Sequence, residues 1–231
     1  MKKLSKRLQK TKELIIETEY SPKQSVEILK KTATAKFIES TEAHISLNID
    51  PKYADQQLRT TLVLPKGTGK TIRIAILLSE EKIKPEYKKQ ADIVGSNDLI
   101  EKITKGEINF DILLSTPEMM PKLAKLGRIL GPKGLMPSPK SGTVTENIEE
   151  TIEQFKKGKI EYKADRNGIV HLSFGKSNFS EEDLIENLLA VYQSIEQNKP
   201  SGVKGKYFKK FYICNSMGPS IQINLSDLKK Q

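Results

Sequence analysis

The alternation of apolar and polar residues along the chain predicts two different kinds of structure. A strand expected to begin near residue 35 alternates apolar and polar positions through 49, and a second alternating strand is expected over 58–64. Residues 72–78 form a nearly continuous apolar run, which predicts a strand buried on both faces. Helices and short strands are then expected to alternate at 84–90, 91–94, 96–105 and 110–114. This order predicts a parallel α/β layer in the middle of the chain.

Both ends of the chain combine helices with strands that can pair with each other. Ser21 and Ser180 are expected to cap two helices, because a serine at the N-cap accepts a hydrogen bond from the first helical turn. Asn167-Gly168 predicts the turn of a hairpin between strands at 159–163 and 169–174. The remaining expected elements are a helix at 3–17 and closing strands at 207–214 and 221–224.

These patterns predict a mixed fold, α+β and α/β, in two domains. Residues 1–66 and 160–231, the two ends of the chain, are expected to form one discontinuous α+β domain. Residues 67–159 are expected to form an inserted Rossmann-like α/β domain. Because both crossings between the domains carry glycine, they predict a hinge.

The net charge of the chain indicates which class of partner the protein binds. Lysine and arginine number 39 against 29 acidic residues, for a net charge of +10, and most of the basic residues are lysine. This excess favours a polyanionic partner, with nucleic acid first and an anionic membrane second. Because 67–159 holds only 16 basic and 13 acidic residues, most of the excess lies in the chain ends. The discontinuous domain is therefore expected to provide the main RNA surface.

Other features of the composition argue against several classes of protein. Cys214 is the only cysteine, so an intramolecular disulfide is excluded and a reducing compartment fits. With only two histidines, His44 and His171, the chain lacks the residues of an ordinary zinc site, and no cofactor is expected. An apolar run long enough to span a bilayer is absent, so no membrane partner is expected. The N-terminus resembles neither a signal nor a transit peptide, so we expect the protein to work where it is made.

Residues 126–145, LGRILGPKGLMPSPKSGTVT, form a basic segment rich in glycine and proline and without an acidic residue. Its prolines exclude one continuous helix, and its apolar residues predict that it packs on a core. It is either a surface for RNA or protein or a rigid connector with solvated lysines. The spacing at 131–134 matches a KH-type loop, but the prolines at 137 and 139 argue against the helix that should follow. The segment 67–71 resembles the end of a phosphate loop but has leucine where the motif needs glycine, at 64.

Four blocks of the sequence together resemble one known family. The first is the segment 126–145 and the second is FIESTEAHISLNIDPKYADQQLRTTLVLPKGTGK, which begins at Phe37. The third is IEYKADRNGIVHLSFGK, and the fourth is the turn NSMGPS at 215–220. All four resemble the large-subunit ribosomal protein family that forms the mobile stalk beside the tRNA exit site, the L-one family. Two departures are Lys66, where the family usually has histidine, and Ser216, where it has threonine.

The resemblance implies a function in translation. It implies a structural, non-enzymatic constituent of the large ribosomal subunit that binds the stalk region of 23S rRNA directly. It also implies assistance in the release of deacylated tRNA from the exit site and repression of translation by binding its own messenger RNA. Heavy use of Lys, Ile and Asn favours a plastid-encoded protein in the chloroplast stroma, with the bacterial cytoplasm as the alternative. The rivals are an extraribosomal RNA-binding regulator of the same fold and a nucleotide-dependent enzyme using 67–71.

The resemblance also implies which residues bind RNA: Lys36, Phe37, Ser40, Lys163, His171, Lys176, Ser216, Met217 and Gly218. An aromatic ring can cover a ribose or a base, a serine can reach a 2′-hydroxyl, and lysines can contact phosphate. A methionine can serve as a flexible apolar pad, and a glycine allows close approach of the backbone.

Several of these residues could instead have a purely structural role. Phe37 could be an ordinary core residue, His171 a structural hydrogen-bonding group, and the segment Ser216-Met217-Gly218 only a turn. Glu39, between Phe37 and Ser40, is expected to orient a neighbouring cation rather than to meet phosphate.

Overall fold

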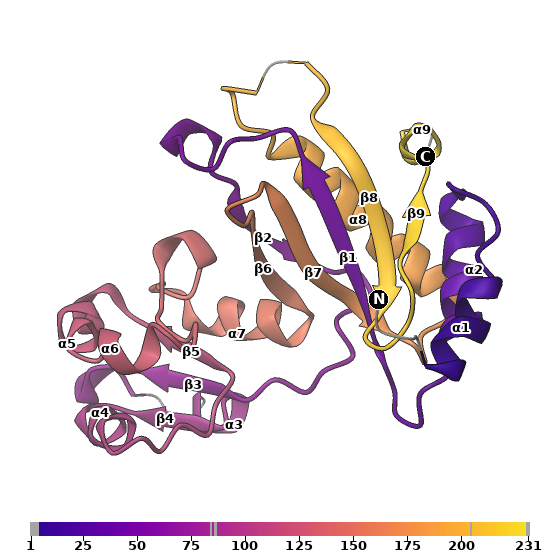
Figure 1. The fold of residues 1–231 in the computed structure, drawn as a ribbon. Coiled ribbons are helices and arrows are strands. Elements are labelled where there is room, and N and C mark those ends of the chain that lie inside the picture. Colours follow the sequence, from indigo (N-terminus) through magenta and orange to yellow (C-terminus); the bar gives the residue numbers. More distant parts are fainter. Residues whose placement is uncertain (1–4, 84, 86, 204, 230–231) are drawn as a thin grey trace. The chain divides into compact units, whose positions relative to one another are not determined.

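The computed structural model describes residues 5–83, 85, 87–203 and 205–229 of the chain. The chain forms two compact units, one of residues 1–69 with 160–231 and the other of residues 70–159 (Figure 1). The mixed α+β and α/β class predicted from the sequence is confirmed. In the part of the chain that the structure describes, no helix has the length and apolar character needed to cross a bilayer.

A four-stranded antiparallel sheet with two helices on one face forms the centre of the discontinuous unit (Figure 1). Its strands, in spatial order, are β7 (Ile169–Lys176), β1 (Ser40–Leu47), β8 (Phe208–Asn215) and β9 (Ile221–Ile223). The helices are α2 (Pro22–Thr32) and α8 (Glu181–Gln197). Ser21 and Ser180 cap them as predicted, each accepting a hydrogen bond from the first turn.

The two faces of this sheet differ in burial. Alternate residues of β1, from Thr41 to Leu47, are buried against the helices, while the residues between them are only half buried. Side chains alternate between the faces of a strand, so one face belongs to the core and the other meets solvent. The face away from the helices, which we call the open face, carries Glu42 and His44 of β1 and Cys214 of β8.

The prediction that the strands at 159–163 and 169–174 pair as a hairpin is wrong. The turn between them forms, with the Gly168 N–H donating to the Asp165 carbonyl at 3.1 Å. However, β6 (Lys159–Lys163) pairs with β2 (Arg59–Val63) in a separate two-stranded sheet, and β7 pairs with β1. The two predicted partners share one bridge only, Ala164 with Val170. Beyond this bridge the backbone turns to the segment before β2, where the Ala164 N–H donates to the Leu58 carbonyl at 2.9 Å.

Two other predicted elements are shorter than expected. The N-terminal helix α1 is Lys6–Glu13, and positions 3 and 4 of the predicted helix lie outside the described residues. The strand expected from residue 35 begins only at Ser40, because 35–39 forms a closed loop. The smaller remaining elements of this unit are the turn η1 (Ala54–Gln56) and α9 (Leu225–Leu228).

The second unit contains the predicted parallel α/β layer. Its sheet has the order β4 (Ile93–Gly95), β3 (Ile74–Leu77) and β5 (Ile112–Ser115), and both pairings are parallel. All four residues of β3 are buried, and alternate ones enter two different apolar clusters, as expected for a strand covered on both faces. The helical segments are η2 (Glu80–Lys82), α3 (Tyr87–Gln90), α4 (Asn97–Thr104), η3 (Pro117–Met119), α5 (Met120–Ala124), α6 (Gly127–Leu130), η4 (Pro139–Ser141) and α7 (Ile148–Lys156). Residues 84 and 86 of the helix predicted at 84–90 lie outside the described residues.

The basic segment 126–145 is pinned in this unit by apolar residues, as predicted. Leu126 and Leu130 are buried, and Leu135 packs against the same cluster. The Leu135 N–H donates to the Leu130 carbonyl at 3.0 Å, which closes the loop that follows α6. The basic side chains of Arg128 and Lys133 are exposed. The segment therefore presents charge from a fixed backbone.

Asn187 fixes the chain near the first crossing between the units. Its buried amide donates to the Gly67 carbonyl at 3.1 Å and to the Phe174 carbonyl at 2.8 Å, and its oxygen accepts from the Lys66 N–H at 3.0 Å. Glycines with positive φ flank both crossings, with 70° at Gly67 and 103° at Gly158. Helix α8 therefore holds the end of the first segment through one asparagine.

We predict that Asn187→Ala lowers the free energy of unfolding by about 1–3 kcal/mol, because it leaves buried backbone groups without partners. Gln193→Ala, an exposed substitution on the same helix, should change it by less than about 0.5 kcal/mol. Urea unfolding followed by circular dichroism measures both. Equal effects would show that the three hydrogen bonds contribute nothing beyond helix propensity.

Candidate nucleic-acid interface

Three segments of the discontinuous unit meet at one end of its sheet: the start of β1, the end of β7 and the turn after β8. Ser40 lies opposite Lys176 in the strand register, and the Lys176 ammonium donates to the Ser40 hydroxyl at 2.9 Å. The Ser216 N–H donates to the Ser40 carbonyl at 3.0 Å, and the Ser40 N–H donates to the Ser216 hydroxyl at 3.2 Å. Three of the predicted RNA-binding residues are therefore joined directly.

A buried carboxylate holds the adjacent loop and turn together. Glu39 is 1% exposed and accepts hydrogen bonds from the Ala35 N–H at 3.0 Å and from the Met217 N–H at 2.9 Å. The first bond closes the loop 35–39, and the second ties that loop to the turn after β8. The expectation that Glu39 orients a cation is wrong, because its two partners are backbone amides. Hydrogen bonds to a carboxylate are stronger than neutral ones, so this clamp is firm.

The clamp leaves several side chains pointing away from the core. Lys36, Phe37 and Ile38 all lie on the exposed part of the closed loop, where Phe37 is 55% exposed. Met217, in the adjoining turn, is 52% exposed. The alternative in which Phe37 is a core residue is therefore wrong. Apolar side chains held open beside basic ones form a surface suited to the sugars and bases of RNA.

Arg7 of the basic helix α1 belongs to the same surface, through contacts that no local pattern predicted. Its guanidinium donates to the Thr34 hydroxyl at 3.0 Å and to the Met217 carbonyl at 2.8 Å. A guanidinium has five N–H donors, so the others stay available to an anion. Because Arg7 and Met217 are separated by 210 positions, no local motif could have linked them.

Gly218 has a packing role beside the predicted approach to RNA. A Cβ at this position would lie 3.2 Å from the Cβ of Asn215, closer than most such contacts. Asn215 is itself buried and donates to the Leu29 carbonyl of α2 at 2.6 Å. Substitution of Gly218 would therefore disturb the turn as well as any RNA beside it.

The structure places the last two predicted residues away from this end of the sheet. His171 lies five residues before Lys176 on β7, a separation of about 16 Å along a strand. Lys163 belongs to β6, in the two-stranded sheet. His171 has structural partners: its Nδ1 is 2.8 Å from the Nδ1 of His44, and its Nε2 is 3.7 Å from Asp165.

The half-buried environment of the open face perturbs two ionisable groups. Desolvation lowers the pKa of His44, and the neighbouring His171 lowers it further. Burial raises the pKa of the Cys214 thiol to about 11. Both groups are therefore mainly neutral at pH 7.

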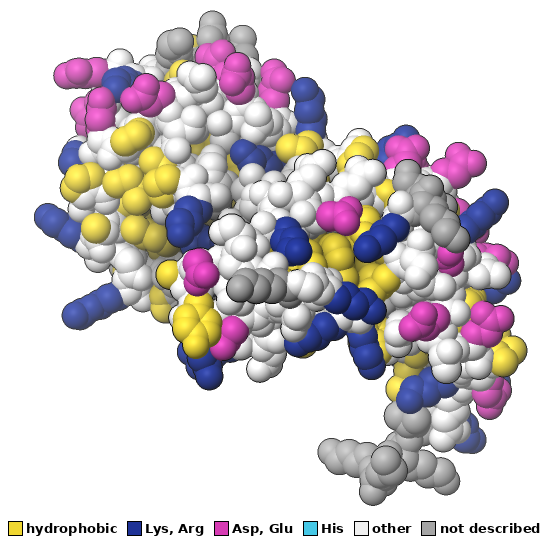
Figure 2. Space-filling view, turned by 90° about the horizontal axis from the view of Figure 1, so that it is seen from above, with side chains coloured by type: hydrophobic (Ala, Val, Ile, Leu, Met, Phe, Trp, Pro, Cys, Tyr) yellow, Lys and Arg dark blue, Asp and Glu magenta, His cyan; other side chains and the backbone are white. Residues whose placement is uncertain are grey.

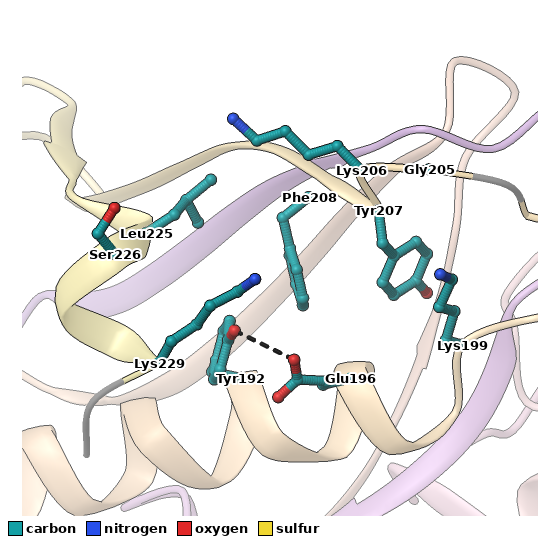
Figure 3. Close-up of a pocket in the computed structure, with 10 residues that line it drawn as sticks. All are labelled: Tyr192, Glu196, Lys199, Gly205, Lys206, Tyr207, Phe208, Leu225, Ser226 and Lys229. Carbon is teal, nitrogen blue, oxygen red and sulfur yellow. Dashed lines mark hydrogen bonds between the residues drawn. The ribbon is translucent and has the colours of Figure 1, made fainter.

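A basic pocket lies at the other end of β8, at its first residues (Figure 3). The cavity has a volume of about 270 Å³ and includes the stacked rings of Tyr192 and Phe208, whose centroids are 4.8 Å apart. Three lysines also line it: Lys199, Lys206 and Lys229. Burial raises the pKa of Tyr192 to about 12, and its hydroxyl donates to Glu196 at 3.4 Å. Figure 2 looks onto the molecule from above and shows basic side chains around exposed hydrophobic areas.

Comparison with known proteins gives a consistent result over nearly the whole chain. A sequence model of the Ribosomal protein L1p/L10e family matches residues 29–219. The chain is 58% identical over 229 residues to the large ribosomal subunit protein uL1c of Guillardia theta, a match that covers 99% of this chain and 98% of that protein. It is 64% identical over 202 residues to uL1c of Phaeodactylum tricornutum, covering 87% and 88%. It is 54% identical over 230 residues to the large ribosomal subunit protein uL1 of Thermosynechococcus vestitus, covering 100% and 97%.

We predict that Glu39→Gln loosens the loop 35–39 and the turn at Met217 together, because an amide keeps one acceptor oxygen and must place its NH₂ group opposite an N–H donor. The free energy that holds the loop and the turn closed should fall by about 1–3 kcal/mol. Hydrogen exchange at the amides of Ala35 and Met217 measures it. Exchange should accelerate at both amides and stay unchanged in Glu13→Gln, an exposed substitution in α1. Acceleration at only one amide would contradict a single clamp.

Proposed function

The chain belongs to the ribosomal protein L1p/L10e family, as its sequence blocks predicted, and on that premise we propose that its discontinuous unit binds 23S rRNA directly at the mobile stalk. Proteins of this family are structural, non-enzymatic components of the ribosome, and the relatives named above are large-subunit proteins. The rival role as a nucleotide-dependent enzyme is therefore wrong. The fold agrees, because the strand β3 follows the segment 67–71, where a phosphate loop requires a helix.

The observation that carries the proposal is the pair of exposed apolar side chains, Phe37 and Met217, beside the cations of Lys36, Lys176 and Arg7. Stacking on a base or ribose needs an exposed flat or flexible apolar group, and neutralisation of phosphate needs cations at its edge. Glu39 holds the loop and the turn that carry the apolar side chains. Lys176 is bonded to the Ser40 hydroxyl, and Arg7 is bonded directly to the turn. The surface is therefore rigid before RNA arrives, which lowers the entropic cost of binding.

The hydroxyl of Ser40 illustrates the contact we propose. It accepts the hydrogen bond from Lys176, so its own proton remains for an acceptor such as a phosphate oxygen or a 2′-hydroxyl. Lys176 meanwhile holds its positive charge at the same point of the surface. Serine and lysine together can thus contact one nucleotide through its sugar and its phosphate.

We also propose that the stalk assists the release of deacylated tRNA from the exit site. The support is the family resemblance together with the glycines at the two crossings, Gly67 and Gly158, because a residue without a Cβ can adopt the positive φ angles found there as well as the usual negative ones. A messenger that imitates the rRNA site would meet the same surface, so repression of the protein's own messenger requires no further site.

For the location of the protein we propose the ribosomes of the plastid stroma. Relatives of the plastid type are 58% and 64% identical to the chain, and the cyanobacterial relative is 54% identical. The alternative compartment is the bacterial cytoplasm. The remaining rival role is that of an extraribosomal RNA-binding regulator. Co-sedimentation with large subunits at high salt distinguishes the two roles, because only a constituent of the subunit should stay bound.

We predict that Phe37→Ala and Met217→Ala each weaken binding to the rRNA stalk fragment by about 1–3 kcal/mol, the range for a lost base–aromatic stack or a buried apolar side chain. The free energy of unfolding should change by less than about 0.5 kcal/mol, because both side chains are exposed. Tyr53→Ala is the matched control, since Tyr53 is a 59% exposed aromatic residue outside the surface. Binding and thermal melts of all three variants test the proposal. Equal affinities would exclude Phe37 and Met217 from the site.

A second prediction concerns salt. Affinity for the same fragment should fall steeply as salt rises, and Lys36→Gln or Lys176→Gln should each reduce the slope of log affinity against log salt by about 0.7–0.9. Lys157→Gln, an exposed change at the C-cap of α7 in the other unit, should leave the slope unchanged. A titration series at several salt concentrations measures the slopes. A flat response of the unmodified protein would rule out phosphate contacts.

A further inference from the structure

The open face of the four-stranded sheet carries a cluster of metal-ligating side chains beside the RNA surface. Glu42 lies opposite Cys214 in the register of β1 with β8, and His44 lies two residues further along β1 on the same face. The Nε2 of His44 is 3.2 Å from the Cys214 sulfur and 3.8 Å from a Glu42 carboxylate oxygen. One ligand atom from each residue can be chosen so that all three lie within 4.8 Å of one another.

These distances agree with tetrahedral zinc. With Zn–S near 2.3 Å and Zn–N near 2.0–2.1 Å, tetrahedral angles place the nitrogen about 3.6 Å from the sulfur and about 3.4 Å from a carboxylate oxygen. The measured separations of 3.2 and 3.8 Å lie on either side of these values, so small side-chain rotations reach the required geometry. The side chains of His44 and Glu42 are 29% and 39% exposed, which leaves an entry path and room for a water as fourth ligand.

A chain of polar groups behind His44 sets the orientation of its ring. The Asp165 carboxylate, 3.7 Å from the Nε2 of His171, favours a proton on that nitrogen. The Nδ1 of His171 then has a lone pair and accepts from the Nδ1–H of His44, 2.8 Å away. This tautomer leaves the Nε2 of His44 with its lone pair directed at Cys214 and Glu42. A carboxylate or other acceptor behind a ligating histidine is the usual support of a metal site.

We propose that Glu42, His44 and Cys214 bind one zinc-type divalent cation on the open face, with His171 as a positioning residue. Binding of the ion would release the proton of the Cys214 thiol, and the resulting thiolate together with the imidazole selects a borderline-soft ion, whereas magnesium and calcium prefer oxygen ligands alone. The sequence prediction of no metal site counted cysteine and histidine only, and the carboxylate of Glu42 supplies the missing ligand. Glu42 and Cys214 are each two residues, about 7 Å, from Ser40 and Ser216. A bound ion would therefore tie β1 to β8 next to the RNA surface.

The test uses the full-length, reduced, metal-free protein and cobalt(II) as a spectroscopic probe. One equivalent of cobalt should produce a thiolate-to-cobalt charge-transfer band and the visible bands of a four-coordinate ion. Zinc should displace the cobalt with the same stoichiometry. Because this measurement uses the unmodified protein, it does not depend on how any variant folds. Absence of the charge-transfer band would overturn the proposal.

Variants then identify the ligands. Cys214→Ser should abolish the charge-transfer band, and His44→Gln and Glu42→Gln should each lower zinc affinity at least about tenfold in competition with a chromophoric chelator. His171→Gln should keep the band and lower affinity by about 10- to 100-fold, as expected of a residue that acts through another. Glu13→Gln, exposed in α1, should change nothing. A band that persists in Cys214→Ser, or equal affinity in all variants, would overturn the assignment. Circular dichroism of each variant checks its fold.

Discussion

The buried carboxylate of Glu39 is the interaction on which the proposed RNA surface depends. A charge removed from water is costly unless hydrogen bonds compensate it, and the amides of Ala35 and Met217 do so here. The two amides come from segments that are far apart in the chain, so the carboxylate fixes the loop and the turn relative to each other. The adjacent bonds between Ser40 and Ser216 then continue the strand ladder to the same edge. Without the clamp, only the Ser40–Ser216 bonds and the Arg7 side chain would connect the loop to the turn.

The two faces of the four-stranded sheet have different roles. The face covered by α2 and α8 supplies the apolar core, and Asn187 uses its position in α8 to hold the chain near the first crossing. The open face keeps polar groups half buried, where neighbouring side chains can perturb and orient them. His44 meets His171 on one side and Cys214 on the other, because three adjacent antiparallel strands bring them together. The proposed RNA surface at one end of the sheet and the proposed metal site on its open face therefore rest on one strand arrangement.

The inserted unit differs from the discontinuous unit in how its central strand is buried. Its central strand β3 is covered on both faces, so nearly every residue of that strand is apolar and its chemistry is left to the loops. The basic segment after α5 is the clearest example, since buried leucines fix it while Arg128 and Lys133 stay exposed. Such a segment can serve as a binding surface without adding polar groups to the core.

Local patterns in the sequence were sufficient to predict the approximate positions of the strands, the caps at Ser21 and Ser180, the parallel layer and the family, because each depends on residues close together in the chain or on long matching blocks. The tertiary structure alone decided that β6 pairs with β2, that Glu39 accepts from Met217, and that Arg7 reaches the same turn. These contacts join positions about 100 to 210 residues apart. Hydrophobic periodicity shows which face of a strand is buried, but the partner of its edge is settled by the competition of all strands for backbone hydrogen bonds.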